Sequence, residues 1–174
     1  MQRKWIVLSQ TLTTTGVYHT ARTTARRLSS RYYAGKAVIR ESAKEVGDRT
    51  IEAYAASWAT MLPDWYEIGT VWIVDRLRSN GLARQLMMEI IQLVSRDDRF
   101  FLITREATIM KLALELGFVP VTTRTHPDIL QWASKIGIVA RLPASVHPIA
   151  PNTWARPQAG ERWLFVRDAN SSAR

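Results

Sequence analysis

The segment of the sequence best suited to bind an anion is Arg78-Ser79-Asn80-Gly81-Leu82-Ala83. It lies between an expected strand and an expected helix, whose first N–H groups lack helical partners and favour phosphate. Gly81 permits backbone angles that side chains disfavour, and Ala83 keeps the start of the helix narrow. Arg78 and Arg84 add positive charge. The turn therefore predicts capture of a phosphate or pyrophosphate, although glycines also occur at such junctions without a ligand.

The elements around this turn follow from hydrophobic spacing. Residues 66–74 are β-branched or aromatic on both faces, which is typical of a central strand buried on both sides. Residues 81–95 repeat their apolar positions at helical spacing. The other expected strands are 4–9, 37–40, 100–104, 118–121 and 162–167, and the other expected helices are 19–33, 108–116 and 127–138. Residues 51–61 fit either a strand or a helix.

Length and composition limit the class of protein. The 174 residues are 47% hydrophobic and fit a single domain over 1–174, in which 124–161 is interpreted as an insertion between the last two strands. No apolar run is long enough to span a bilayer and no secretory signal is evident, so we expect a cytoplasmic protein without a membrane segment. The chain has no cysteine, and its histidines (His19, His126 and His147) are far apart, so no metal site is expected.

Positive charge is concentrated near the N-terminus. Residues 1–40 contain eight Lys or Arg and no Asp or Glu, whereas the rest of the chain has 16 basic and 15 acidic residues. Four of these arginines fall one turn apart in pairs on the expected helix: Arg22, Arg26, Arg27 and Arg31. Such a face attracts nucleic acid, an acidic partner or the phosphates of a cofactor, or is simply a solvated helix face.

Residues 66–121 resemble the core of the GNAT superfamily of N-acetyltransferases. The hallmark of that family is Gln/Arg-x-x-Gly-x-Gly/Ala between a strand and a helix, and Arg78, Gly81 and Ala83 occupy its three specified positions. The family also has a Gly-Phe pair that opens a later strand, which Gly117 and Phe118 match. The resemblance implies an α/β fold, with a central mixed, mostly antiparallel sheet flanked by helices and a splayed central strand that admits the cofactor.

The same resemblance implies that the cofactor is acetyl-CoA, used as a co-substrate. Backbone groups of Ile73 and Val74 would pair with its pantetheine arm. The amides that would hold its pyrophosphate belong to Ser79, Asn80, Gly81, Leu82, Ala83 and Arg84.

Glu67 is the leading candidate for the general base that deprotonates the acceptor amine. It precedes Arg78 by eleven residues, the spacing of the catalytic glutamate in the histone-acetylating branch of the family. Asp64 or a bound water are alternatives. Many relatives protonate the leaving thiolate with a tyrosine, but that position is Ala113 here. The proton would then come from solvent or from another hydroxyl, such as that of Tyr66.

These features predict an acetyl-CoA-dependent N-acetyltransferase in which a primary amine attacks the thioester directly. The acceptor amine is not identified, and a homodimer is left open. A nucleic-acid-directed factor, which modifies tRNA or DNA or binds it through the basic segment, is the alternative of a different class. A non-catalytic member of the family is a third hypothesis.

Overall fold

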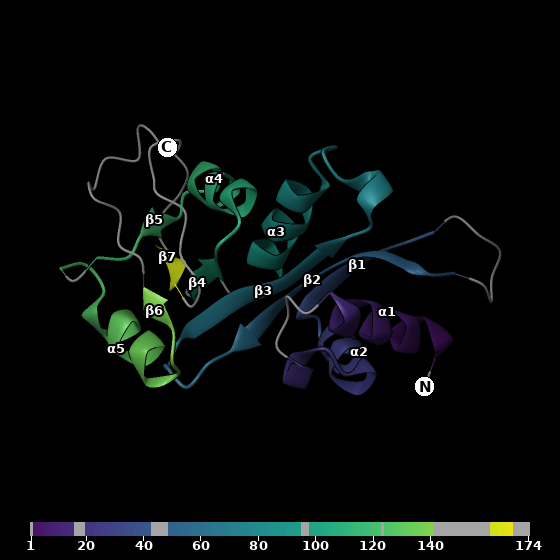
Figure 1. Cartoon of the computed structure of the whole chain (residues 1–174), viewed down its shortest axis with the longest axis horizontal. Helices are drawn as coiled ribbons and strands as arrows, with labels where there is room; N and C mark the ends of the chain where they lie inside the picture. The colour runs from purple at the N-terminus through teal and green to yellow at the C-terminus, as the bar shows by residue number, and fades with distance from the viewer. Residues whose placement is uncertain are drawn as a thin grey trace. The chain divides into compact units, whose positions relative to one another are not determined.

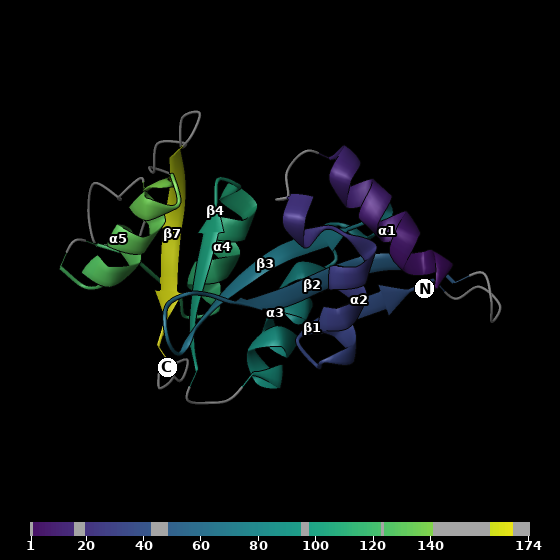
Figure 2. The ribbon, with the colours of Figure 1, turned by 90° about the horizontal axis from the view of Figure 1, so that it is seen from below.

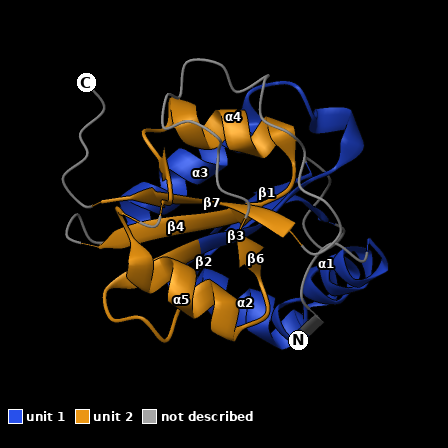
Figure 3. Cartoon of the chain, turned by 60° about the vertical axis from the view of Figure 1, so that its left-hand side comes forward, with its two compact units in different colours: residues 1–58, 68–95 blue, residues 59–67, 96–174 orange. Residues whose placement is uncertain are grey.

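The computed structural model describes residues 2–15, 20–42, 49–94, 98–122, 124–140 and 161–168. The chain divides into two compact units, which Figure 3 colours separately: residues 1–58 with 68–95, and residues 59–67 with 96–174. Helices accompany strands whose described pairs are mostly antiparallel, so the expected α/β class is confirmed. None of the described helices is long and apolar enough to cross a membrane.

The first unit contains the anion-binding turn and the basic segment. Its helices are α1 (Arg3–Thr14), α2 (Ala25–Tyr33) and α3 (Leu82–Leu93), and its strands are β1 (Ala37–Glu41), β2 (Ile51–Ala59) and most of β3 (Trp65–Ile73). The order of the strands is β1-β2-β3, and β1 runs antiparallel to β2. Figure 1 shows α1 and α2 on one side of these strands and α3 on the other. Residues 51–61, which fitted either element, thus form mainly strand β2.

The prediction of a strand at residues 4–9 is wrong, because this segment lies within helix α1. Trp5, Leu8 and Leu12 are spaced by three and four residues, so one helical face carries all three, and each is buried. The threonines after the apolar run, which favour strands, are accommodated because the hydroxyls of Thr11 and Thr13 donate to carbonyls four residues earlier. Burial of these three apolar side chains therefore outweighs the β propensity of the threonines.

The helix expected over 19–33 is shorter in the structure. A 3-10 turn at Thr20–Arg22 comes first, and α2 begins after Thr24, whose hydroxyl accepts from the Arg27 amide. Residues 16–19 lie outside the described part of the chain. Arg22 therefore precedes the helix that carries Arg31, and the four arginines do not belong to one helical face.

Tyr54 anchors α2 to the core of the first unit. It is fully buried on β2, packs edge-on against Trp5 and donates its hydroxyl to the Leu28 carbonyl at 3.3 Å. Burial raises the pKa of the Tyr54 hydroxyl far above its ordinary value, and the nearby Arg31 charge opposes this rise only in part.

Replacing Tyr54 with Phe should lower the free energy of unfolding by about 1 kcal/mol at neutral pH, because the Leu28 carbonyl loses its buried donor. In the parent protein, stability should fall as the pH rises above about 10, since tyrosine ionises first in the unfolded chain. Tyr54→Phe should weaken that fall. Urea titrations measure both effects, with Tyr33→Phe as the control on an exposed tyrosine. Equal losses in the two variants would contradict the assigned hydrogen bond.

The second unit is built around β7 (Glu161–Arg167). β7 pairs antiparallel with β4 (Arg99–Thr104) and β5 (Val119–Pro120), and in parallel with β6 (Val139–Ala140). The views in Figures 1 and 2 both show α4 (Ala107–Glu115) and α5 (Pro127–Lys135) on opposite sides of the β4–β7 pair. Leu102 faces Phe165 in the register, and both are buried.

The described part of the 124–161 segment contains α5 and the short strand β6, and residues 141–160 lie outside the described residues. α5 ends at Lys135. Just after this end, Gly137 has a φ of +77°, and the Ile138 amide donates back to the Ala133 carbonyl. The segment therefore adds a strand to β7 rather than only a loop. The division of the whole chain into one domain with an insertion stays a prediction.

Candidate functional site

The turn before α3 has an unusual backbone. Ser79 and Gly81 both lie in the left-handed region, with φ of +69° and +72°. Gly81 is the N-cap residue of α3, and as a glycine it has no side chain that could cap the first amides of this helix. A Cβ placed on Gly81 would meet no atom within 4 Å. The start of α3 is therefore open, with backbone donors that no capping side chain covers.

The first helical bond of α3 runs from the Gln85 amide to the Gly81 carbonyl at 3.1 Å. The amides of Leu82, Ala83 and Arg84 precede this bond, so they have no acceptor four residues earlier within the helix. Three such N–H groups at the positive end of a 12-residue helix form a favourable place for a pyrophosphate. The structure thus gives the turn the local geometry that the sequence indicated.

The strained residue of this turn is Ser79, and its replacement offers a direct measure of the strain. Ser79→Gly should raise the free energy of unfolding by about 0.5 kcal/mol, because glycine has no Cβ penalty at positive φ. The neighbouring Asn80 is not among the described residues with positive φ. Asn80→Gly should therefore lower stability by a similar amount, and urea titration of both variants checks the contrast. If both substitutions destabilise equally, Ser79 is not strained.

Arg78 connects the end of β3 to the turn. Its Nε donates to the Ile73 carbonyl at 3.1 Å, and its Nη2 lies 2.9 Å from an Asp75 carboxylate oxygen. Both side chains are largely exposed, so the ion pair contributes little stability. Arg84 is exposed on the first turn of α3. The positive charge of Arg78 is thus partly neutralised by Asp75.

The backbone groups at Ile73 and Val74 already have partners within the first unit. The Val74 amide donates to the Glu52 carbonyl at 2.8 Å, and the Val74 carbonyl accepts from Leu77 at 3.0 Å. The Ile73 carbonyl accepts from Arg78. A carbonyl oxygen has two lone pairs, so the Ile73 oxygen can accept one further donor, whereas the Val74 amide has no second proton to give.

Thr70 is a feature of β3 that the sequence reasoning missed. It is buried within the strand and has a φ of +55°. A β-branched residue in the left-handed region is a genuine outlier, and such outliers concentrate at functional sites. The preceding Gly69 was the available signal, because a glycine inside a strand often marks a bulge or a close backbone approach.

Tyr66 and Glu67 lie at the start of β3, within the second unit, and both are half-buried. The Tyr66 ring is 6.4 Å from that of Phe100. Trp65, just before them, is buried and its carbonyl accepts from the Thr60 hydroxyl at 3.1 Å. The candidate base is therefore carried by a strand rather than by a loop.

The second motif of the sequence has a structural role. Gly117, with a φ of +80°, ends α4, and the Phe118 amide donates to the Ala113 carbonyl at 2.9 Å. Phe118 is then buried. The Ala113 side chain is a fully buried methyl group, so this position holds no hydroxyl that could protonate a leaving group.

His126 packs against other side chains of the second unit. Its Nε2 lies 3.7 Å from an Asp168 oxygen, and its ring packs edge-on against Trp65 at 5.8 Å. Within the described residues its Nδ1 is buried without a hydrogen-bond partner. These contacts fit a packed histidine beside the end of β7.

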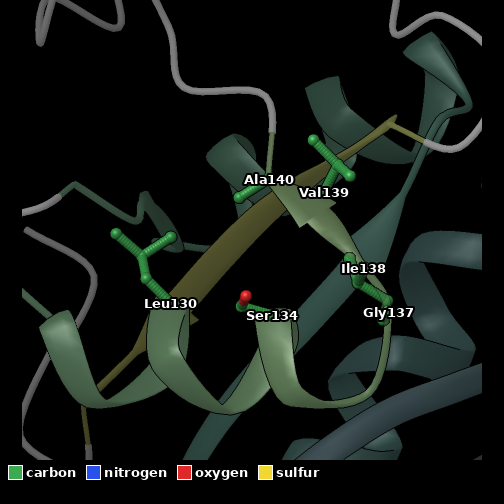
Figure 4. Close-up of a pocket in the computed structure, with 6 residues that line it drawn as sticks. All are labelled: Leu130, Ser134, Gly137, Ile138, Val139 and Ala140. Carbon is green, nitrogen blue, oxygen red and sulfur yellow. The ribbon is translucent and has the colours of Figure 1, made fainter.

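A pocket of about 350 Å³ lies between α5 and β6 (Figure 4). Its lining is Leu130, Ser134, Gly137, Ile138, Val139 and Ala140. The Ser134 hydroxyl is the one polar side-chain group of that lining, and no charged side chain contributes to it. The described residues of the lining therefore supply neither a base nor an anion-binding group.

The comparisons with known proteins bear on the fold. No protein-family model and no curated protein matches the sequence. Among solved structures, similarity extends to N-acetylglutamate synthase from Neisseria gonorrhoeae, complexed with coenzyme A and N-acetyl-glutamate, at 15% identity and a TM-score of 0.55. The match covers 95% of this chain and 32% of the synthase, so the chain spans about a third of that protein.

Two further structures match over nearly their whole length. The diaminobutyrate acetyltransferase from Paenibacillus lautus, in complex with L-2,4-diaminobutyric acid and coenzyme A, has 14% identity, a TM-score of 0.55, and coverage of 96% of this chain and 90% of its own. Arabidopsis thaliana NAA60, in complex with a bisubstrate analogue, has 13% identity and a TM-score of 0.56, and the match covers 99% of this chain and 97% of NAA60. The chain shares the fold of these three structures. Within that fold, β3, the turn and α3 form the strand–turn–helix on which the sequence resemblance rested.

Proposed function

We propose that the chain is an acetyl-CoA-dependent N-acetyltransferase that holds the cofactor's pyrophosphate at the start of α3. One observation supports this most: the Gly81 N-cap is left-handed, lacks a capping side chain and faces open space. The first amides of α3 are therefore accessible to an anion at the positive end of the helix. The GNAT fold supports the choice of acetyl-CoA among pyrophosphate-containing ligands.

The proposed reaction is direct acyl transfer to a primary amine. Glu67 accepts a proton from the acceptor ammonium, directly or through one water, and the free amine attacks the thioester carbonyl carbon. A C–N bond forms, the C–S bond breaks, and the nitrogen loses a further proton to solvent, which leaves a neutral amide. Because Ala113 offers no proton, the thiolate is protonated by Tyr66 or by solvent. Backbone groups of β3 near Ile73 bind the pantetheine arm and keep the thioester beside the strand.

Calorimetric titration with acetyl-CoA and with S-acetylpantetheine tests the assigned site. S-acetylpantetheine carries the same thioester but lacks the pyrophosphate. Acetyl-CoA should bind in the micromolar to millimolar range usual for substrates, and S-acetylpantetheine should bind at least about tenfold more weakly. Equal affinities would mean that the turn at Gly81 holds no pyrophosphate. Absence of binding by either compound would refute the cofactor assignment.

A further inference from the structure

A second pocket, of about 440 Å³, lies between the start of α1 and the second half of α2. Its lining is Gln2, Trp5, Ser29 and Tyr33, and all four residues belong to the first unit. The two helices pack against each other, and Figures 1 and 2 both show them side by side. α3 lies on the other side of the strands of this unit. The pocket is therefore separate from the turn at Gly81.

Tyr33 gives this pocket an exposed aromatic wall. The residue is 66% exposed, which is unusual for so large a side chain. Its ring lies 6.3 Å from that of Trp5, edge-on, and 5.4 Å from that of Tyr32. Trp5 is itself buried. Two rings thus position Tyr33 while much of its surface stays open for a planar ligand to stack on.

The remaining groups of the lining are polar and uncharged. Gln2 is exposed, and its carboxamide contains both donors and an acceptor. The Ser29 hydroxyl donates to the Arg26 carbonyl at 3.0 Å, so its oxygen can still accept a hydrogen bond. The edge of a nucleobase also carries donors and acceptors. The pocket therefore combines a stacking surface with groups that complement a base.

Positive charge lies on the same helix as this pocket. Arg26 precedes Ser29 by three residues and Tyr33 by seven, spacings that place all three on one helical face. Arg26 and Arg27 are exposed, and within the described residues no acid forms an ion pair with either. Residues 1–40 contain no Asp or Glu that would offset these charges. The face of α2 that leads to Tyr33 thus attracts anions.

The other two arginines of the basic segment do not contribute to this surface. The guanidinium carbons of Arg22 and Arg31 lie 5.3 and 4.9 Å from the ring centre of Trp58, and both residues are half-buried. The exposed basic surface is therefore narrower than the sequence indicated. It consists of Arg26 and Arg27 and ends at the pocket.

We propose that this surface binds single-stranded nucleic acid, with one base stacked on Tyr33 and the phosphate backbone along α2 at Arg26 and Arg27. Aromatic side chains beside a line of cations are the usual means of holding a single strand. Arg26 lies about 10 Å from Tyr33 along the helix axis. A strand that continues beyond the stacked base can therefore reach the charges at the start of α2. The proposal does not rest on the proposed acetyl transfer.

A single strand fits this surface better than a duplex or a membrane. The bases of a duplex are paired and stacked, so none of them is available to Tyr33. An anionic membrane would be attracted by the same arginines, but its hydrocarbon could not satisfy the polar groups of Gln2 and Ser29. Each of these alternatives is an arm of the test.

Binding is measured as the fluorescence anisotropy of a labelled short oligouridine strand with the full chain. The strand should bind saturably and more tightly than a labelled duplex of the same length, and its affinity should fall as salt is raised. Excess CoA should not compete, because the pocket is separate from the turn at Gly81. No binding at low salt, equal affinity for the duplex, or competition by CoA would overturn the proposal.

Two variants of Tyr33 test the stacking. Tyr33→Ala should weaken strand binding at least about fivefold, because the stacked base loses its ring. Tyr33→Phe keeps the ring and should bind within about twofold of the parent protein. The exposure of Tyr33 means that both variants should fold, which urea titration checks. Equal losses in the two variants, or no loss in Tyr33→Ala, would overturn the stacking role.

Two charge-matched pairs separate this surface from the net charge of the chain. Arg26→Ala/Arg27→Ala should weaken strand binding at least about tenfold and lower the slope of log affinity against log salt by about 1.4, or about 0.7 for each lost phosphate contact. Arg105→Ala/Arg124→Ala removes two exposed charges from the second unit and should change affinity less than about twofold. Equal effects of the two pairs would overturn the proposal.

The side-chain amide of Gln2 reports where the strand binds. In ¹H–¹⁵N spectra of the full chain, Gln2→Ala removes the two resonances of this amide and so assigns them. Oligouridine should shift both resonances saturably. No shift with the strand, or binding of phosphatidylserine vesicles in place of the strand, would overturn the proposal.

Discussion

A Gly81→Glu variant is expected to bind acetyl-CoA at least about 100-fold more weakly than the parent protein. The new side chain would project from a position where a Cβ meets no other atom within 4 Å, the space assigned to the pyrophosphate. Its negative charge would repel that group by about 4 kcal/mol at about 4 Å under the screening typical of a protein surface, more than the roughly 2.7 kcal/mol that corresponds to 100-fold. Calorimetric titration measures the loss.

Gly35→Glu is the matched control for this substitution. Gly35 belongs to the same unit and has a φ of +66°, and a Cβ added there would likewise meet no atom within 4 Å. The two variants therefore carry the same charge change and similar backbone strain. Gly35→Glu should bind acetyl-CoA like the parent, and parallel losses would assign the Gly81 effect to strain or net charge instead of the site.

The second large effect is expected at Glu67. Glu67→Gln should lower kcat by a factor of about 10²–10⁴, because the amide has nearly the same shape but cannot accept a proton from the ammonium. The affinity for acetyl-CoA should be unchanged. The defect should shrink as the pH rises, since more of the amine is then already deprotonated. CoA release with a primary amine, recorded across pH, tests all three statements.

Asp64→Asn is the control for Glu67→Gln. Asp64 precedes β3, is exposed and has a φ of +62°, which asparagine tolerates as well as aspartate. This substitution should leave kcat within about twofold of the parent. A large loss in Asp64→Asn with none in Glu67→Gln would transfer the role of base to Asp64. A small effect of both would indicate that a water molecule alone accepts the proton.

The elements that position the turn could be predicted because their local signals agree. Residues 66–74 combine β-branched and aromatic side chains on both faces, and β3 covers Trp65–Ile73. Residues 81–95 follow helical spacing, and α3 covers Leu82–Leu93. Gly81 marked the boundary between them, and the structure places it at the N-cap in the left-handed region. Pattern, propensity and turn chemistry indicated the same boundary here.

The first element was misassigned because a short apolar run does not distinguish a strand from a helix. Residues 4–9 are apolar enough for either, and the threonines that follow favour a strand. The deciding signal lay further along the chain, at Leu12, which continues the stripe of Trp5 and Leu8 at helical spacing. The segment from residue 4 to residue 9 does not include Leu12, so it does not show the helical spacing.

The cation–π contacts of Trp58 could not be predicted, because they join residues distant in sequence. The spacing of Arg22 and Arg26 suggested a shared helical face, but the cap at Thr24 separates them. Trp58 gave no local sign of receiving Arg22 and Arg31, since that pairing depends on how the 3-10 turn and α2 lie on β2.

The contacts of Arg78 require an N–H donor more than a positive charge. The Arg78 side chain donates through Nε to the Ile73 carbonyl, while Asp75 offsets its charge. A glutamine amide can donate to the same carbonyl and brings no charge at all. Arg78 therefore connects the end of β3 to the turn before α3, and in the proposed function the attraction for the phosphates of acetyl-CoA is expected from the backbone amides.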